Sequence, residues 1–182
     1  MYMANNVSFQ LGNSGTRDWR ITFNVLPTTL AQLQELPIAD LTEPQNTAAL
    51  TIAALCMHQA DKEITFEMLN FLKGPQSLSP YEKQFLSDRL RGKSYLPYSF
   101  FEGAVPDNNY TPVQPFTVTI METPHSQTQA NEGYVQLYIS SGGADSPRPI
   151  KLRLQSSTGK WFMWEQMLLS DIRIPKEADP WQ

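Results

Sequence analysis

The sequence predicts an α+β protein in which a helical N-terminal half packs on a C-terminal antiparallel meander of three to four strands. Apolar residues recur at helical spacing across residues 30–90. From residue 116 onward they alternate with polar residues, and short turns join the alternating runs. The chain of 182 residues contains no clean linker, so we predict a single domain. Residues 1–15 are polar and are expected to be disordered in part.

A strand and a short helix are predicted before the long helices. In residues 19–26, Ile21, Phe23 and Val25 alternate with polar residues, which indicates a half-buried strand. Residues 28–36 are compatible with a short helix, and Pro37 is expected to end it.

Two long helices are predicted next. Thr42 and Gln45 have the spacing of a capping box, and the helix over residues 46–59 is apolar nearly all round, as expected of a central helix. Residues 61–73 continue with apolar residues at helical spacing, and Gly74 is expected to stop that helix.

Ser79, Pro80 and Glu82 form the strongest local signal in the chain. The serine is predicted to cap a helix, the proline to occupy its first position, and the glutamate to reach back to the cap. Gly92 marks the predicted stop. The apolar face of this helix is expected to consist of Tyr81, Phe85 and Leu86.

The strand-rich half begins at Phe116. Alternation places the following residues on the inner face of three strands: Phe116, Val118, Ile120, Val135, Leu137, Ile139, Ile150, Leu152 and Leu154. A further run at residues 160–168 follows a turn signal at 157–159.

The loop Ser-Gly-Gly-Ala-Asp-Ser-Pro-Arg-Pro, residues 141–149, separates two of these strands. A phosphate cradle needs a helix after the glycines, but here a strand follows. The loop is therefore interpreted as a hairpin connection. Arg148 is predicted to pair with Asp145 or Asp171.

Composition narrows the possible partners and locations. A net charge of -4 gives no general attraction to nucleic acid or to anionic membranes, so neither is predicted as a partner. Cys56 is the single cysteine, which favours a reducing compartment. We see no signal peptide in residues 1–10, and the apolar run 48–57 is too short to cross a bilayer. A soluble, cytoplasmic protein is predicted, although a leader before Met1 is left open.

The chain carries little that points to catalysis. Neither His58 nor His125 lies in a metal-binding motif, so no metal and no cofactor are predicted. Cys56 lies among apolar helix residues, where a thiol is inert. Four carboxylates near aromatic residues are weak candidates for a glycosidase pair. They are Glu102, Asp107, Glu165 and Asp171.

The aromatic and proline-rich segment 95–115 is the remaining anomaly. Its rings either cover the sheet as core or form a ligand surface together with the rim at 142–148. On the second interpretation, the candidate binding residues are Tyr98, Phe101, Tyr110 and Arg148, with the arginine holding a carboxylate.

Two classes of function remain open. The first is a non-catalytic binding or interaction module that uses segment 95–115, with an unknown protein or a small apolar ligand as its partner. The second is a small hydrolase or lyase-type enzyme with a carboxylate or His58 in a sheet-lined pocket. The lack of a recognisable catalytic motif favours the first. The oligomeric state is left open.

Several long runs also resemble a known family. Residues 46–56, 67–112, 141–153 and 161–175 look like those of a family of uncharacterised bacterial proteins common in gut Firmicutes. The resemblance extends over residues 42–182 and implies a bacterial, intracellular origin, but it supplies no activity or site residue. The order of elements is also similar, loosely, to the cone-shaped folds of the nuclear-transport-factor-like superfamily.

Overall fold

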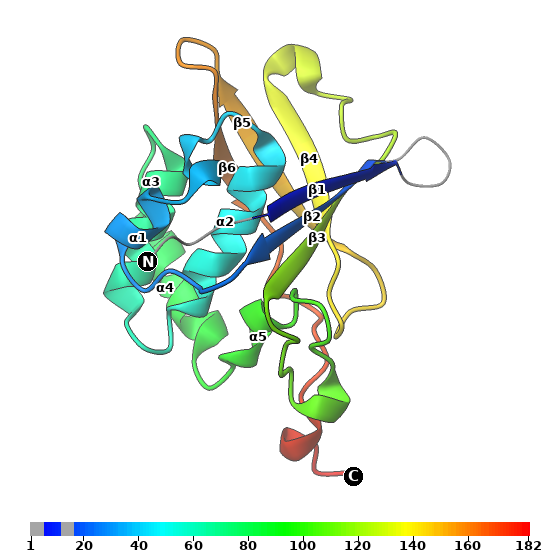
Figure 1. Cartoon of the computed structure of the whole chain (residues 1–182). Helices are drawn as coiled ribbons and strands as arrows, with labels where there is room; N and C mark the ends of the chain where they lie inside the picture. The colour runs from blue at the N-terminus through cyan, green and yellow to red at the C-terminus, as the bar shows by residue number, and fades with distance from the viewer. Residues whose placement is uncertain (1–5, 12–16) are drawn as a thin grey trace.

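The computed structural model describes residues 6–11 and 17–182 and confirms the α+β class (Figure 1). Helices α1 to α4 lie on one side of an antiparallel sheet whose strands follow chain order. The strands of the described residues are β1 (Asn6–Leu11), β2 (Arg17–Phe23), β3 (Phe116–Glu122), β4 (Tyr134–Ile139), β5 (Arg148–Gln155) and β6 (Lys160–Gln166). The helices are α1 (Leu30–Gln34), α2 (Pro44–Cys56), α3 (Lys62–Lys73), α4 (Pro80–Leu90) and α5 (Tyr95–Tyr98).

The sheet has six strands, so the prediction of three to four is wrong. The predicted early strand is β2, and it joins the C-terminal meander by pairing with β3, with Ile21 opposite Val118. This pairing links parts of the chain about a hundred residues apart, which local alternation does not reveal. β1 extends the sheet further by pairing with β2. Of the N-terminal stretch predicted to be partly disordered, residues 1–5 and 12–15 lie outside the described residues.

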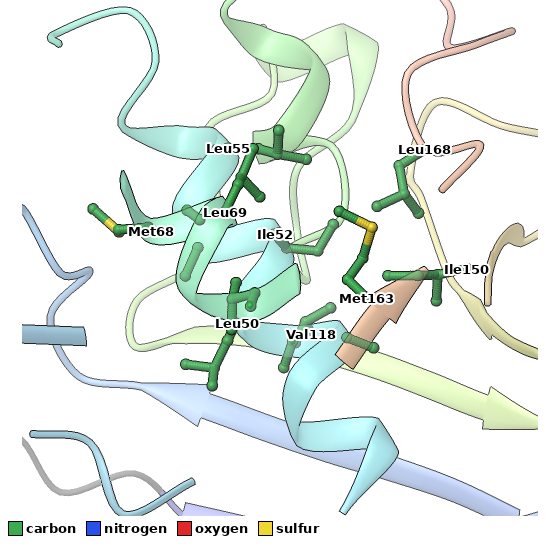
Figure 2. Close-up of a cluster of buried hydrophobic side chains, with 14 of the residues drawn as sticks. Leu50, Ile52, Leu55, Met68, Leu69, Val118, Ile150, Met163 and Leu168 are labelled. Atoms are coloured by element: carbon green, nitrogen blue, oxygen red, sulfur yellow. The ribbon is translucent and has the colours of Figure 1, made fainter. Parts of the chain in front are cut away.

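Helix α2 is the centre of the core, as predicted. Every residue from Gln45 to Cys56 is buried between the sheet and α3. Figure 2 shows Ile52 of α2 and Met163 of β6 pointing toward one another. The hydroxyl of Thr47 donates a hydrogen bond of 2.7 Å to the carbonyl of Trp161 in β6, so a buried polar group is satisfied and α2 is tied to the sheet.

The start of α2 differs from the prediction. Thr42 does not cap the helix, because Glu43 occupies the cap position and makes no side-chain cap bond. The carboxylate of Asp40 accepts hydrogen bonds from both the backbone N–H and the hydroxyl of Thr42, at 3.1 and 3.0 Å. The Thr42 hydroxyl therefore belongs to the preceding turn.

The start of α4 confirms the predicted capping box. The N–H of Glu82 donates to Ser79 Oγ at 3.1 Å, and the N–H of Ser79 donates to Glu82 Oε2 at 2.7 Å. The predicted apolar face is wrong in part, because Tyr81 is 78% exposed and Phe85 is also exposed. Leu86 and Leu90 face the core instead, since residues four apart share one side of a helix.

Strand β6 forms one edge of the sheet and carries a β-bulge. Lys151 pairs with Glu165, and Leu152 pairs with Met163, so Trp164 is the extra residue on the edge strand. Within the described ranges, no helix is both long and apolar enough to cross a membrane.

Candidate functional site

The aromatic rings of segment 95–115 lie mostly inside the protein, although much of the rest of the segment is exposed. Phe101 is 2% exposed and Tyr110 is 3% exposed, whereas Tyr98 is half-buried. The ring of Tyr110 stacks on that of Tyr95 with 5.3 Å between centroids, and burial raises the pKa of Tyr110 to about 12. The two buried rings offer almost no surface to a ligand. A binding role for the predicted set stays a prediction, and this burial counts against it.

Segment 95–115 and the predicted rim at 142–148 do contact each other, but the contact is close packing and leaves no open ligand surface between the contacting residues. The N–H of Gly142 donates to the carbonyl of Ser99 at 2.9 Å. A Cβ added at Gly142 would lie 1.9 Å from the carbonyl oxygen of Ala104, and one at Gly143 would lie 2.1 Å from Tyr110 Oη. Both glycines are therefore explained by close packing between two loops. The loop itself joins β4 to β5, which confirms the hairpin interpretation.

The predicted partner of Asp145 is wrong. Its carboxylate pairs with Arg173 of the C-terminal segment, with 2.6 Å between the charged atoms. Arg148 is half-buried and pairs with neither Asp145 nor Asp171 in the described structure, and its Nε is buried without a hydrogen-bond partner. A role for the Arg148 guanidinium in holding a carboxylate stays a prediction.

The titratable candidates for catalysis are dispersed. His58 packs on the ring of Phe66 at 6.2 Å, and its pKa is lowered by burial and, to a smaller degree, by the charge of Lys62. The Arg20 guanidinium donates two hydrogen bonds to the Glu102 carboxylate, from Nε to Oε1 at 2.7 Å and from Nη2 to Oε2 at 2.6 Å. In the part of the chain that the structure describes, no cluster of three or more histidine, cysteine or acidic residues could hold a metal.

A different site lies along the edge of the sheet at β6, beside α3 and α4. Two adjoining hollows meet at Trp164, and together they are called the Trp164 groove. The apolar hollow, of about 190 Å³, is lined chiefly by Leu55, Leu69, Leu78, Phe85, Leu86 and Trp164. The polar hollow, of about 350 Å³, is lined chiefly by Lys73, Gln76, Arg153, Ser156, Ser157 and Trp164.

An ion pair between α3 and α4 stands where the two hollows adjoin. Lys73 lines the polar hollow, and its side chain is only 6% exposed. Its Nζ lies 2.9 Å from Oε1 of Glu82, which lines the apolar hollow. Burial alone would raise the pKa of Glu82, but hydrogen bonds from Ser79 and Lys73 hold it below its usual value. The carboxylate is therefore ionised at neutral pH and neutralises the buried lysine.

Arg153 is the second cation that lines the polar hollow, beside Lys73. Its guanidinium lies over the ring of Trp164, 4.5 Å from the centroid, and beside Tyr134 at 5.4 Å. Among the described residues, no carboxylate lies within ion-pair distance of Arg153. Two rings hold the guanidinium in place while its N–H donors remain available, an arrangement suited to a carboxylate or phosphate.

Sequence reasoning missed the Trp164 groove for two reasons. Lys151 and Arg153 are visible in the sequence as a small basic patch, but the aromatic partners of Arg153 come from β4 and β6. The position of Trp164 also depends on the β-bulge, which places it at the edge of the sheet between two hollows. A bulge that depends on cross-strand register leaves no strong local pattern in the sequence.

Comparison with known proteins gives a family but no activity. No curated protein and no solved structure matches this chain significantly. The likeness to nuclear-transport-factor-like cone folds and the bacterial origin therefore stay predictions. Residues 25–176 match the model of a domain of unknown function, DUF6935. This match extends over most of the chain and agrees with the resemblance seen in the sequence, so the chain belongs to the DUF6935 family.

Proposed function

We propose that this protein is a non-catalytic binding module whose ligand lies in the Trp164 groove and carries a carboxylate or phosphate beside an apolar body. One observation carries the proposal. Arg153 lies over two aromatic rings at the polar hollow and has no acidic partner among the described residues. A cation oriented in this way loses little conformational entropy when it binds an anion.

The walls of the groove suit the rest of such a ligand. Trp164 offers ring surface to both hollows, and Phe85 adds a second apolar wall. Ser156 and Ser157 line the same hollow as Arg153, and their hydroxyl groups can accept or donate hydrogen bonds. A mostly apolar cleft with a few convergent polar groups is typical of small-ligand sites.

The groove favours binding over the hydrolase or lyase alternative. Two carboxylates line the apolar hollow, Glu82 and Glu165, and Glu82 is already held by Ser79 and Lys73 and has a lowered pKa. A general acid needs a carboxyl group that keeps its proton near neutral pH. His58 packs on Phe66 outside both hollows.

Phenylacetate and phenyl phosphate are suitable probes for this proposal. Each combines a ring with an anion, and benzyl alcohol provides an uncharged control of similar size. We expect saturable changes in the indole N–H resonance of Trp164 and in the Nε–H resonance of Arg153, measured by NMR. Arg153→Gln should weaken binding about tenfold, because a hydrogen bond between two charged groups is lost.

Lys151→Gln is the matched control for this substitution. Lys151 lies on the same strand, and its Nζ also lies over the ring of Tyr134, at 5.5 Å. It does not line either hollow. The variant should bind both anionic probes like the original protein. If neither anion shifts Trp164, or if benzyl alcohol binds as well as phenylacetate, the proposed function is wrong.

A further inference from the structure

We propose that the natural ligand of the Trp164 groove is the C-terminal end of an extended peptide, which adds as an antiparallel strand to the edge of β6. This inference rests on the proposed function and names the class of its ligand. Its three supports are the free backbone edge of β6, the apolar hollow beside that edge, and the cation at the end where the edge is blocked.

The edge of β6 is blocked at one end and open at the other. The N–H of Trp161 points away from β5 and donates to the carbonyl of Leu41 at 2.7 Å. Phe162 packs against Gly74, where an added Cβ would lie 2.5 Å from the ring. From Met163 to Gln166, no hydrogen bond joins the backbone to a helix or loop beyond β5 in the described ranges.

Strand geometry exposes at least one donor on this open edge. N–H groups alternate in direction along an antiparallel strand, so that of Met163 points the same way as that of Trp161. Met163 precedes the bulge, so the alternation still holds there. It also lines the apolar hollow, together with Trp164, Glu165 and Gln166. A hydrogen-bonding edge that borders a hollow can take a strand of about four residues, or roughly 13 Å.

The helix side of the hollow accommodates the side chains of such a strand. Leu78, Phe85 and Leu86 line it opposite β6, and Phe85 is partly exposed although it is apolar. Alternate side chains of an added strand point to one side, so one of them enters this hollow. An apolar residue near the end of the peptide matches the lining.

The blocked end explains why the peptide should terminate there. A strand that runs antiparallel to β6 has its C-terminus near Phe162, where Gly74 and Leu41 leave no room to continue. Arg153 is the cross-strand neighbour of Phe162 and has no acidic partner among the described residues. A terminal carboxylate supplies the missing negative charge at the point where the chain has to end.

Two peptide pools test the inference on the whole protein. Both contain hexapeptides randomised at the first five positions, with an apolar residue at the last, and they differ only in a free or amidated C-terminus. We expect the free pool to shift the Trp164 indole resonance and to slow hydrogen exchange of the Met163 amide. Amidation, or Arg153→Gln, should weaken binding about tenfold, whereas Lys151→Gln should not.

Each other result overturns the inference and bears differently on the proposed function. Binding of the free pool without protection of the Met163 amide would mean that no strand is added. Equal binding of the two pools would remove the role of the carboxylate. Binding of phenylacetate but of neither pool would leave the proposed function standing without a peptide ligand. If neither pool binds and neither phenylacetate nor phenyl phosphate binds, both proposals are wrong.

Discussion

Lys73, the last residue of α3, lies against Glu82 in the first turn of α4, with 2.9 Å between Nζ and Oε1. The same glutamate accepts a hydrogen bond from the N–H of Ser79 through its other oxygen. One carboxylate therefore closes the cap of α4, neutralises a buried lysine and fixes the boundary between the two hollows of the Trp164 groove. The stability of α4 and the shape of the site depend on the same side chain.

Acid should destabilise the protein through this carboxylate. Hydrogen bonds from Ser79 and Lys73 hold the pKa of Glu82 below its ordinary value in the folded protein, so its contribution to stability is fully present above that ordinary value. The contribution is lost as the pH falls through the lower folded pKa. Urea unfolding from about pH 3 to 7 should show this decline, and Glu82→Gln should flatten it. Glu67→Gln, on the exposed side of α3, should leave the profile unchanged.

Removal of the α4 cap should measurably lower the stability of the protein. Ser79→Ala leaves the N–H of Glu82 without its side-chain acceptor, so we expect the free energy of unfolding to fall by about 1 kcal/mol. Ser87 lies within α4, and Ser87→Ala is a suitable control that should not lower stability, because alanine is favourable in a helix interior. Chemical denaturation measures both variants. Equal midpoints for Ser79→Ala and the original protein would show that the cap contributes nothing.

The two glycines of the β4–β5 loop should not tolerate a side chain. An alanine Cβ at Gly142 would overlap the Ala104 carbonyl, and one at Gly143 would overlap Tyr110 Oη. Either substitution should destabilise the protein by about 1–3 kcal/mol through overpacking. Ser146→Ala, in the exposed part of the same loop, should change neither stability nor probe binding. Thermal unfolding compares the three variants, and a Gly142→Ala protein as stable as the original would contradict the close packing described for this loop.

The single cysteine should be inert in the native protein. Cys56 is buried at the end of α2, and burial raises the pKa of its thiol. A thiol reacts through its thiolate, so a disulfide reagent such as dithionitrobenzoate should modify it slowly in buffer and rapidly in guanidinium. Ellman absorbance measures both rates. Rapid stoichiometric reaction in buffer would show that the end of α2 opens readily.

Local chemistry in the sequence predicted some features of the fold well. The capping box at Ser79 is formed by residues three positions apart, and the alternation around Val135 lies within a single strand. Both signals are local, so both are visible in the sequence. The pairing of β2 with β3 depends on contacts between distant segments, and the number of strands was therefore wrong. Thr42 is not the cap because the helix begins one residue later, with Glu43 at the cap position, and the Thr42 side chain instead bonds to Asp40 in the preceding turn.

The site was harder to predict than the fold. Composition marked segment 95–115 as unusual, but composition does not distinguish a buried ring from an exposed one, and Phe101 and Tyr110 are buried. The Trp164 groove depends on Arg153 lying over rings from two other strands. That arrangement results from cross-strand register and a bulge, both of which are properties of the folded sheet.

The burial of α2 also constrains how the chain can fold during synthesis. The helix leaves the ribosome early, yet its Thr47 hydroxyl bonds to Trp161 in the last strand, 114 positions later. Until β6 has been made, the apolar surface of α2 lacks part of its cover, and contacts between such distant segments form slowly. A nascent chain that stops before residue 160 is therefore expected to be prone to aggregation and to need chaperones.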